Sequence, residues 1–108
     1  MRYDFASPDH AAVRHILGSP TIAARTAGHI GDDDFDWEAL LVEQQTMSGG
    51  ERVLVLLAYD LWEAKGVMGI GDLARRLDRH HFDRVIDAIR ISRGELPVQT
   101  ATPLRDAA

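Results

Sequence analysis

The chain has 108 residues, of which 45% are apolar and none is cysteine, and its formal net charge is −5. This length suits a single domain with its own core, and the lack of cysteine excludes disulfides, thiol nucleophiles and thiolate metal ligands. The charge is uneven, because residues 1–51 carry a net −6 while residues 72–93 carry a net +2. A surface that neutralises nucleic-acid phosphates over the whole domain is therefore disfavoured.

The start of the chain, MRYDFASPDH, contains no basic region followed by an apolar run, so no secretory signal is expected. The longest apolar run covers residues 53–59, which is far short of the roughly 20 residues that span a bilayer. We therefore expect a soluble, cytoplasmic protein that has no membrane partner.

Two segments near the start of the chain each begin with Ser-Pro and end at glycine, which predicts two helices. Ser7 fits the N-cap of the first helix, and Gly18 follows its end. Residues 19–28 have the same pattern, with Ser19 as the predicted N-cap, although this segment is short and only weakly amphipathic.

The next predicted helix runs from Asp36 to about Gln45, with acidic residues in its first turn, where they favour the helix dipole. Apolar and amide side chains at helical spacing give this segment one face that can be buried. The residues of that face are Trp37, Leu40, Leu41 and Gln44.

The Ser-Gly-Gly-Glu stretch that starts at Ser48 resembles the signature of ATP-binding-cassette ATPases, where a similar run opens a helix against a nucleotide's phosphate. Such a signature works only opposite a P-loop, and the chain has no Gly-x-x-x-x-Gly-Lys-[Ser/Thr] motif. Ser48 and Glu51 instead have the spacing of a capping box. We interpret the stretch as the start of a helix over about 49–65, with Gly66 as its C-cap, and an anion or nucleotide site is the weaker alternative.

The C-terminal part predicts two more helices. Asp72 fits the N-cap of a short helix, and a longer helix follows in which apolar residues recur at i, i+3, i+4 and i+7. These apolar residues are Phe82, Val85, Ile86 and Ile89. Gly94 and Pro97 end the pattern, and residues 97–108 are expected to form a flexible tail.

No stretch shows the apolar and polar alternation that a half-buried strand requires. The sequence therefore predicts an all-α fold, a single small helical bundle of four to six helices. At its centre we expect the helix at about 49–65, because this helix is apolar nearly all round. The bundle core is expected within residues 32–96, and residues 1–31 form a helical extension whose packing the sequence leaves open.

A calcium site is one possible use of the acidic segment. Asp32, Asp34 and Asp36 have the spacing of EF-hand loop positions 1, 3 and 5, and Glu43 falls at position 12. Trp37 occupies the position that requires glycine, however, and the segment from Asp36 onward is predicted to be helical. We therefore expect no calcium site and interpret these carboxylates as an exposed loop and N-cap cluster, with an acidic patch for a basic partner as the functional alternative.

The histidines do not have the spacing of a helical zinc site. His80 and His81 are adjacent, so their side chains point about 100° apart on a helix, and His10 and His15 are five positions apart rather than four. No Gly-x-Ser-x-Gly motif marks a nucleophile. We predict no catalytic residue, metal ligand or cofactor, although a metal site assembled from distant histidines stays open. An enzyme would require a deep polar pocket that contains His80 or His81.

Residues 72–93 suggest the alternative of a helix-turn-helix DNA-binding regulator. Several features depart from that motif. Asp78 stands where a small residue is usual, Arg79 stands where an apolar residue should point inward, and the apolar positions that follow come one residue late. The second helix would also present Asp83 and Asp87 to the DNA, whose phosphates repel them. The residues that would contact DNA are Arg75, Arg76, Arg79 and Arg84.

The preferred interpretation is a small acidic protein that binds a protein partner, or a second copy of itself, without catalysing a reaction. The charge separation between the two halves and the wide apolar face of the central helix favour it. Proteins of this size and type are often regulators, or inhibitors carried by mobile genetic elements. The residues expected to bind the partner are the acidic loop and two aromatic residues of the central helix: Asp32, Asp33, Asp34, Asp36, Tyr59 and Trp62.

Overall fold

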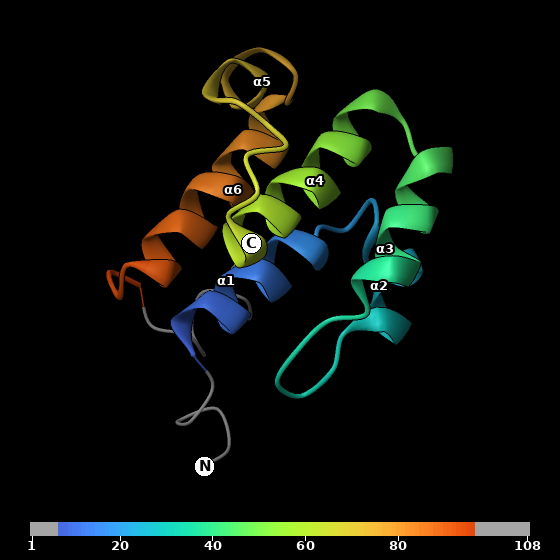
Figure 1. The fold of residues 1–108 in the computed structure, drawn as a ribbon. Coiled ribbons are helices and arrows are strands. Elements are labelled where there is room, and N and C mark those ends of the chain that lie inside the picture. The colour runs from blue at the N-terminus through green and yellow to red at the C-terminus, as the bar shows by residue number, and fades with distance from the viewer. Residues whose placement is uncertain (1–6, 97–108) are drawn as a thin grey trace.

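The computed structural model describes residues 7–96, which form the all-α bundle predicted from the sequence (Figure 1). The described part of the chain has six α-helices and no strand: α1 Pro8–Leu17, α2 Ala23–Thr26, α3 Trp37–Glu43, α4 Gly49–Glu63, α5 Ile70–Arg75 and α6 Arg79–Ser92. Short 3₁₀ turns follow α2 over Ala27–His29 and α3 over Gln44–Thr46. None of these helices combines the length and the apolar character needed to cross a membrane. The predicted tail, residues 97–108, lies outside the described residues.

The core lies where α1 packs against α4 and α6. Although α1 falls within the expected N-terminal extension, its Ala12, Val13 and Leu17 are fully buried at 0% exposure. The predicted central helix, α4, shares the centre of the molecule with α1, since only one side of α4 is fully buried. The buried residues of α4 are Val53, Leu54, Val55 and Ala58, and those of α6 are Val85, Ala88 and Ile91.

Two of the predicted helix starts are confirmed by their hydrogen bonds. The hydroxyl of Ser7 accepts the backbone N–H of His10 at 3.0 Å. The capping box that opens α4 is complete, because Ser48 Oγ accepts the N–H of Glu51 at 3.4 Å and the Glu51 carboxylate accepts the N–H of Ser48 at 3.1 Å. Both caps satisfy amides that would otherwise have no partner at a helix start.

The predicted start of the second helix at Ser19 is wrong. The Ser19 hydroxyl donates backward to the carbonyl of Ile16 at 2.8 Å, so it caps no helix. The carbonyl of Ser19 accepts the N–H groups of both Ile22 and Ala23, which makes a tight turn. As a result α2 begins only at Ala23 and has no side-chain cap.

The predicted C-cap of α4 and N-cap of α5 are also wrong. The left-handed C-cap residue of α4 is Ala64, with φ 56° and ψ 41°, two positions before Gly66. The chain leaves the helix early because the loop amides that follow donate to the carboxylate of Asp60. At α5 the N-cap residue is Gly69, and Asp72 lies one turn inside the helix and accepts the N–H of Gly69 at 3.0 Å.

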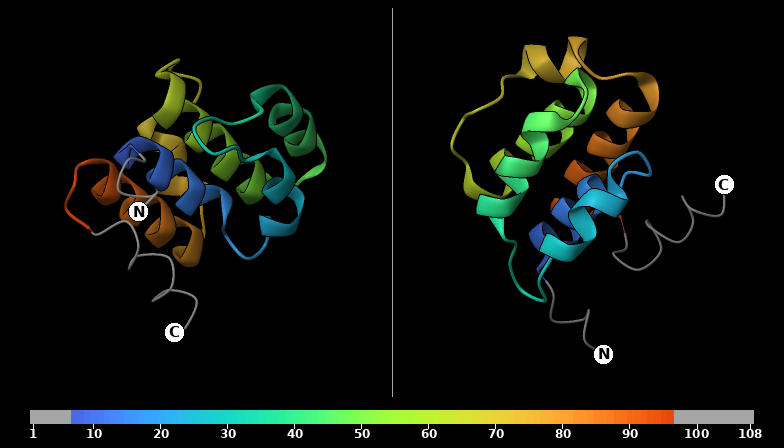
Figure 2. Two further views of the ribbon diagram at one scale, coloured as in Figure 1. Left: turned by 90° about the horizontal axis from the view of Figure 1, so that it is seen from below. Right: turned by 90° about the vertical axis from the view of Figure 1, so that its right-hand side faces the viewer.

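The acidic and the arginine-rich segments lie at opposite ends of the molecule. The right-hand view of Figure 2 shows α5 and the start of α6 at one end, and the loop between α2 and α3 at the other. Figure 1 shows the same separation from the front. The charge asymmetry of the sequence therefore becomes a separation in space.

Candidate interaction surfaces

The acidic loop, residues 31–36, has its backbone fixed to α1. The N–H of Gly31 donates to the carbonyl of Asp34 at 2.8 Å, and a Cβ at position 31 would lie only 2.5 Å from Asp34 Oδ1. The carbonyl of Gly31 lies 3.0 Å from Nε2 of the buried His10, whose Nδ1 accepts a hydrogen bond from Arg14 Nε at 3.1 Å. With Nδ1 as an acceptor, Nε2 carries the proton and donates to the loop.

The side chains of this loop are largely free to meet a partner. Asp32, Asp33 and Asp34 are exposed and make no side-chain hydrogen bond or ion pair within residues 7–96. Asp36, the fourth predicted contact residue, has a structural role instead, because its carboxylate caps α3 by accepting the N–H of Ala39 at 3.1 Å. Three of the four predicted acidic residues are thus available for binding.

The exposed side of α3 continues the negative charge of the loop. Val42 is 60% exposed there, beside an open hollow of about 450 Å³ that is also lined by Glu38 and Glu43. Glu38 is exposed and makes no ion pair with any described residue. We call the three loop carboxylates together with Glu38 and Val42 the acidic surface.

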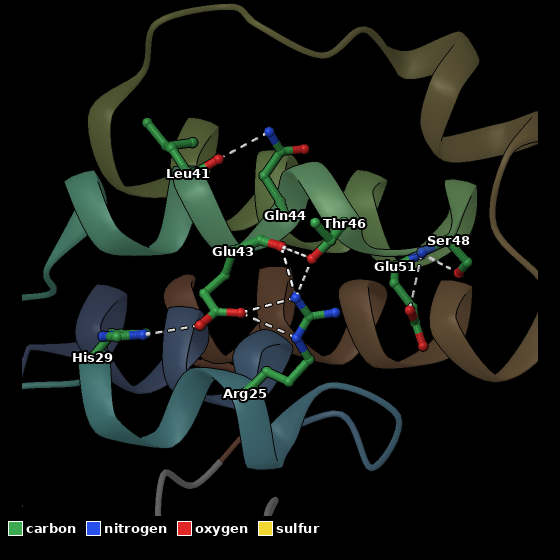
Figure 3. Close-up of polar contacts among 8 residues, drawn as sticks. All are labelled: Arg25, His29, Leu41, Glu43, Gln44, Thr46, Ser48 and Glu51. Atoms are coloured by element: carbon green, nitrogen blue, oxygen red, sulfur yellow. Dashed lines mark hydrogen bonds and ion pairs between the residues drawn. The ribbon is translucent and has the colours of Figure 1, made fainter.

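Glu43 belongs to the same helix but is neutralised by α2. Its carboxylate accepts Nε of Arg25 at 3.0 Å and lies 3.7 Å from Nε2 of His29 (Figure 3). Arg25 also donates to the carbonyl of Glu43 at 3.1 Å and to the hydroxyl of Thr46. These contacts attach α3 to α2, so Glu43 supports the acidic surface and contributes little free charge to it.

An aromatic cluster joins the acidic loop to α4. Phe35 of the loop meets Trp62 edge to face with ring centroids 5.0 Å apart, and Trp37 meets Tyr59 in the same manner at 5.2 Å. His10 stacks on Phe35 at 4.5 Å. Tyr59 and Trp62, which were predicted to bind a partner, are half-buried in this cluster beside the loop. Sequence reasoning missed Phe35, whose position between two aspartates gave no sign of burial.

The arginines proposed as DNA contacts lie in different surroundings. Arg75 and Arg79 are exposed and form no ion pair or hydrogen bond with other described residues. Arg76 is also exposed, but it pairs with Asp72 at 3.3 Å. We call these three arginines the Arg-rich end.

Arg84, the fourth of these arginines, is half-buried and is bonded to α1. Its Nε donates to the carbonyl of His15 at 2.7 Å, which connects α6 to α1. The buried imidazole of His15 lies with its Nε2 3.9 Å from the Asp87 carboxylate. The predicted role of Arg84 on an outer surface is therefore replaced by a structural contact.

The start of α6 borders a cavity of about 450 Å³ that contains both His80 and His81. His81 Nε2 lies 3.1 Å from the hydroxyl of Thr21, and His81 Nδ1 lies 3.6 Å from Asp78 Oδ1. The remaining lining residues are Pro20, Asp83, Arg84 and Asp87. The enzyme alternative required a deep polar pocket, whereas this cavity contains both histidines but is partly open to solvent, and that alternative stays a prediction.

Two carboxyl groups near these arginines have lowered pKa values. The pKa of Asp78 lies below its ordinary value because its carboxylate accepts the N–H of His81, and the nearby imidazoles act in the same direction. The pKa of Asp72 is lowered by the N–H of Gly69 and then by Arg76. Both acids therefore hold their negative charge at the ends of helices that also carry the exposed arginines.

Within residues 7–96, no three histidine, aspartate or glutamate side chains come together in a group that could hold a metal ion. Comparisons of the chain with protein-family models, with curated proteins and with solved structures found no match. The interpretation of the surfaces described above therefore depends on their own chemistry.

Proposed function

We propose that this protein is a non-catalytic interaction module of the cytoplasm, a regulator or inhibitor that binds a basic segment of a protein partner through the acidic surface. One observation carries the proposal. Asp32, Asp33 and Asp34 are exposed side by side without partners in the described chain, on a loop whose backbone is bonded to α1. Carboxylates in this arrangement attract cations and steer a basic partner toward the surface.

The fixed backbone of the loop supports the same proposal. Binding costs less when the surface is already ordered, because fewer conformations are lost. The hydrogen bond from His10 and the stacking of Phe35 hold the loop before any partner arrives. The half-buried Tyr59 and Trp62 beside it offer aromatic area of the kind found at binding hot spots.

A capture experiment with charge-reversal variants tests this function. Wild-type protein is used as bait in a nuclease-treated lysate of the source organism, beside the variant Asp32→Lys/Asp33→Lys/Asp34→Lys. The matched control, Asp9→Lys/Glu63→Lys/Asp83→Lys, has the same net charge change at three separated exposed positions. We expect wild type and control to retain a basic protein that the loop variant loses. Capture of the same protein by the loop variant would contradict the proposal.

A direct titration with an oligoarginine peptide complements the capture. We expect wild type and control to bind this peptide more tightly than the loop variant does, with an affinity that falls as salt rises. An oligoglutamate peptide of equal length serves as the negative probe. Equal affinity of the loop variant for oligoarginine would remove the acidic loop as the binding site.

DNA binding by α5 and α6 is the second candidate function. The exposed and unpaired Arg75 and Arg79 favour it, because free guanidinium groups bind phosphates. This function predicts an affinity for duplex DNA that falls steeply with salt and is lost in Arg79→Glu. Unchanged DNA affinity of Arg79→Glu would rule against it.

A further inference from the structure

The acidic surface and the Arg-rich end are complementary in charge. Residues 32–43 contain six acidic residues and no lysine or arginine. At the other end, residues 70–79 contain three arginines against Asp72 and Asp78, and Arg75 and Arg79 are exposed and make no ion pair with any described residue. Each end of the molecule therefore presents the charges that the other end attracts.

The two ends also share an apolar feature. Three large hydrophobic side chains are exposed among the described residues: Val42 at 60%, Val67 at 49% and Ile70 at 83%. Val42 lies in the acidic surface beside a hollow of about 450 Å³. Ile70 begins α5, the helix that ends at Arg75, and Val67 lies in the loop just before it. Ile70 is thus exposed at the start of the helix that ends at Arg75, and Val42 is exposed beside a hollow that is also lined by Glu38 and Glu43.

The two ends of one molecule do not meet. The right-hand view of Figure 2 shows α5 at one end of the bundle and the acidic loop at the opposite end. Both are attached to the same set of packed helices. Their complementarity can be satisfied only between two molecules.

We infer that the acidic surface is also a docking site for a second copy of this chain, which binds through its Arg-rich end with Ile70 seated against Val42. This inference rests on the proposed function, because it assigns a further occupant to the same surface. The contact is head-to-tail, so a dimer still has one free acidic surface and one free Arg-rich end, and repeated association gives an open chain or a ring. Because the occupant covers the acidic surface, self-association and partner binding exclude each other.

Mass measurements on charge-reversal variants test this contact. Sedimentation of the wild type over a wide concentration range should show a mass that rises above that of the monomer. The mass should return to the monomer when salt rises from about 0.1 M to about 1 M, because the Debye length shortens from about 10 Å to about 3 Å. A wild type that stays monomeric at every concentration and low salt would overturn the inference.

Two variants assign the contact to its surfaces. Asp32→Lys/Asp33→Lys and Arg75→Glu/Arg79→Glu should each weaken self-association about tenfold or more, since each replaces attraction by repulsion. The control Arg90→Glu/Arg93→Glu changes the net charge by the same amount as Arg75→Glu/Arg79→Glu, but at the far end of α6. It should associate as the wild type does. Circular dichroism confirms that each variant is folded. Equal weakening by the control would overturn the inference.

An equimolar mixture of the two surface variants gives the decisive result. Each variant alone repels itself, but the reversed surfaces of one complement those of the other, so the mixture should regain the mass that each lost. A mixture that stays monomeric would overturn the head-to-tail contact.

Oligoarginine binding separates the two proposals, because Arg75→Glu/Arg79→Glu keeps the acidic surface and should bind the peptide. If it binds the peptide while the wild type never self-associates, only the inference fails, and if neither protein binds the peptide, the proposed function fails.

Discussion

The imidazole of His10 lies 3.0 Å from the carbonyl oxygen of Gly31, a contact that joins the first helix to the acidic loop. The same ring stacks on Phe35 and accepts a hydrogen bond from Arg14. One buried side chain therefore fixes both ends of the segment that carries the exposed carboxylates. The position of the acidic surface depends on the core as well as on the loop.

Replacement of His10 by alanine should lower the free energy of unfolding by roughly 2–4 kcal/mol, because it removes a buried ring and two hydrogen bonds. Urea unfolding measures the change. The exposed His80 gives a matched control, and His80→Ala should stay within about 0.5 kcal/mol of wild type. Faster amide hydrogen exchange at Gly31 in His10→Ala would locate the effect in the loop. Equal stability of the two variants would show that the His10 contacts contribute nothing.

Ala64→Gly should stabilise the protein by about 0.5–1 kcal/mol, because glycine adopts the left-handed conformation without the clash that a Cβ causes. The neighbouring exchange Glu63→Gly places glycine inside α4 and should instead destabilise by about 0.5–1 kcal/mol. Thermal unfolding of both variants shows whether the first exchange raises stability and the second lowers it. A loss of stability in Ala64→Gly would mean that α4 does not end in the left-handed conformation described above.

Stability should fall in acid through Asp72 and Asp78. The pKa of each is lower in the folded chain than its ordinary value of 3.8. Such a group contributes stability that is fully present above the unfolded pKa and is lost as pH falls through the folded pKa. Urea unfolding from about pH 6 down to about pH 2 should show this loss below about pH 4. Asp78→Asn keeps an oxygen that can cap α6 but cannot be titrated, so this variant should lose less stability in acid than the wild type does. An equal loss of stability in the two proteins would show that Asp78 does not contribute to it.

Arg84→Met should lower the free energy of unfolding by about 1–2 kcal/mol, because the carbonyl of His15 loses its donor. Arg79→Met, at an exposed position that makes no hydrogen bond or ion pair with the described residues, should change stability by less than about 0.5 kcal/mol. Chemical unfolding of both variants separates an arginine that holds α6 to α1 from one that faces solvent. Equal stability of the two variants would show that the hydrogen bond from Arg84 to His15 contributes nothing to stability.

The helices themselves could be predicted because their signals are local. Ser48 and Glu51 lie three residues apart, and each bonds to the backbone of the other, so the sequence alone contains the whole motif. Ser19 has an equally good local pattern, yet its hydroxyl bonds backward because the chain turns there to pass from α1 to α2. Local propensity was overridden by the path that the core requires.

The composition of the candidate site could be predicted only in part. Exposed aspartates follow from charge and loop position, whereas the contact of Phe35 with Trp62 joins residues 27 positions apart and leaves no periodic signal. The same holds for Arg84, whose partner on α1 is 69 positions away. Pairings at this distance are set by the packing of whole helices, which a single sequence does not display.

The pairing of α1 with α6 has a consequence for how the chain is made. Among the described helices, α1 leaves the ribosome first and α6, which covers part of its apolar side, leaves last, with 69 positions between His15 and Arg84. Contacts so distant in sequence form late in folding, because closing a long loop costs more entropy than forming a local contact. Until α6 is made, the part of α1 that packs against α6 stays uncovered, a state in which chains are prone to aggregate or to engage chaperones. Truncation before α6 should therefore leave an insoluble product rather than a smaller folded domain.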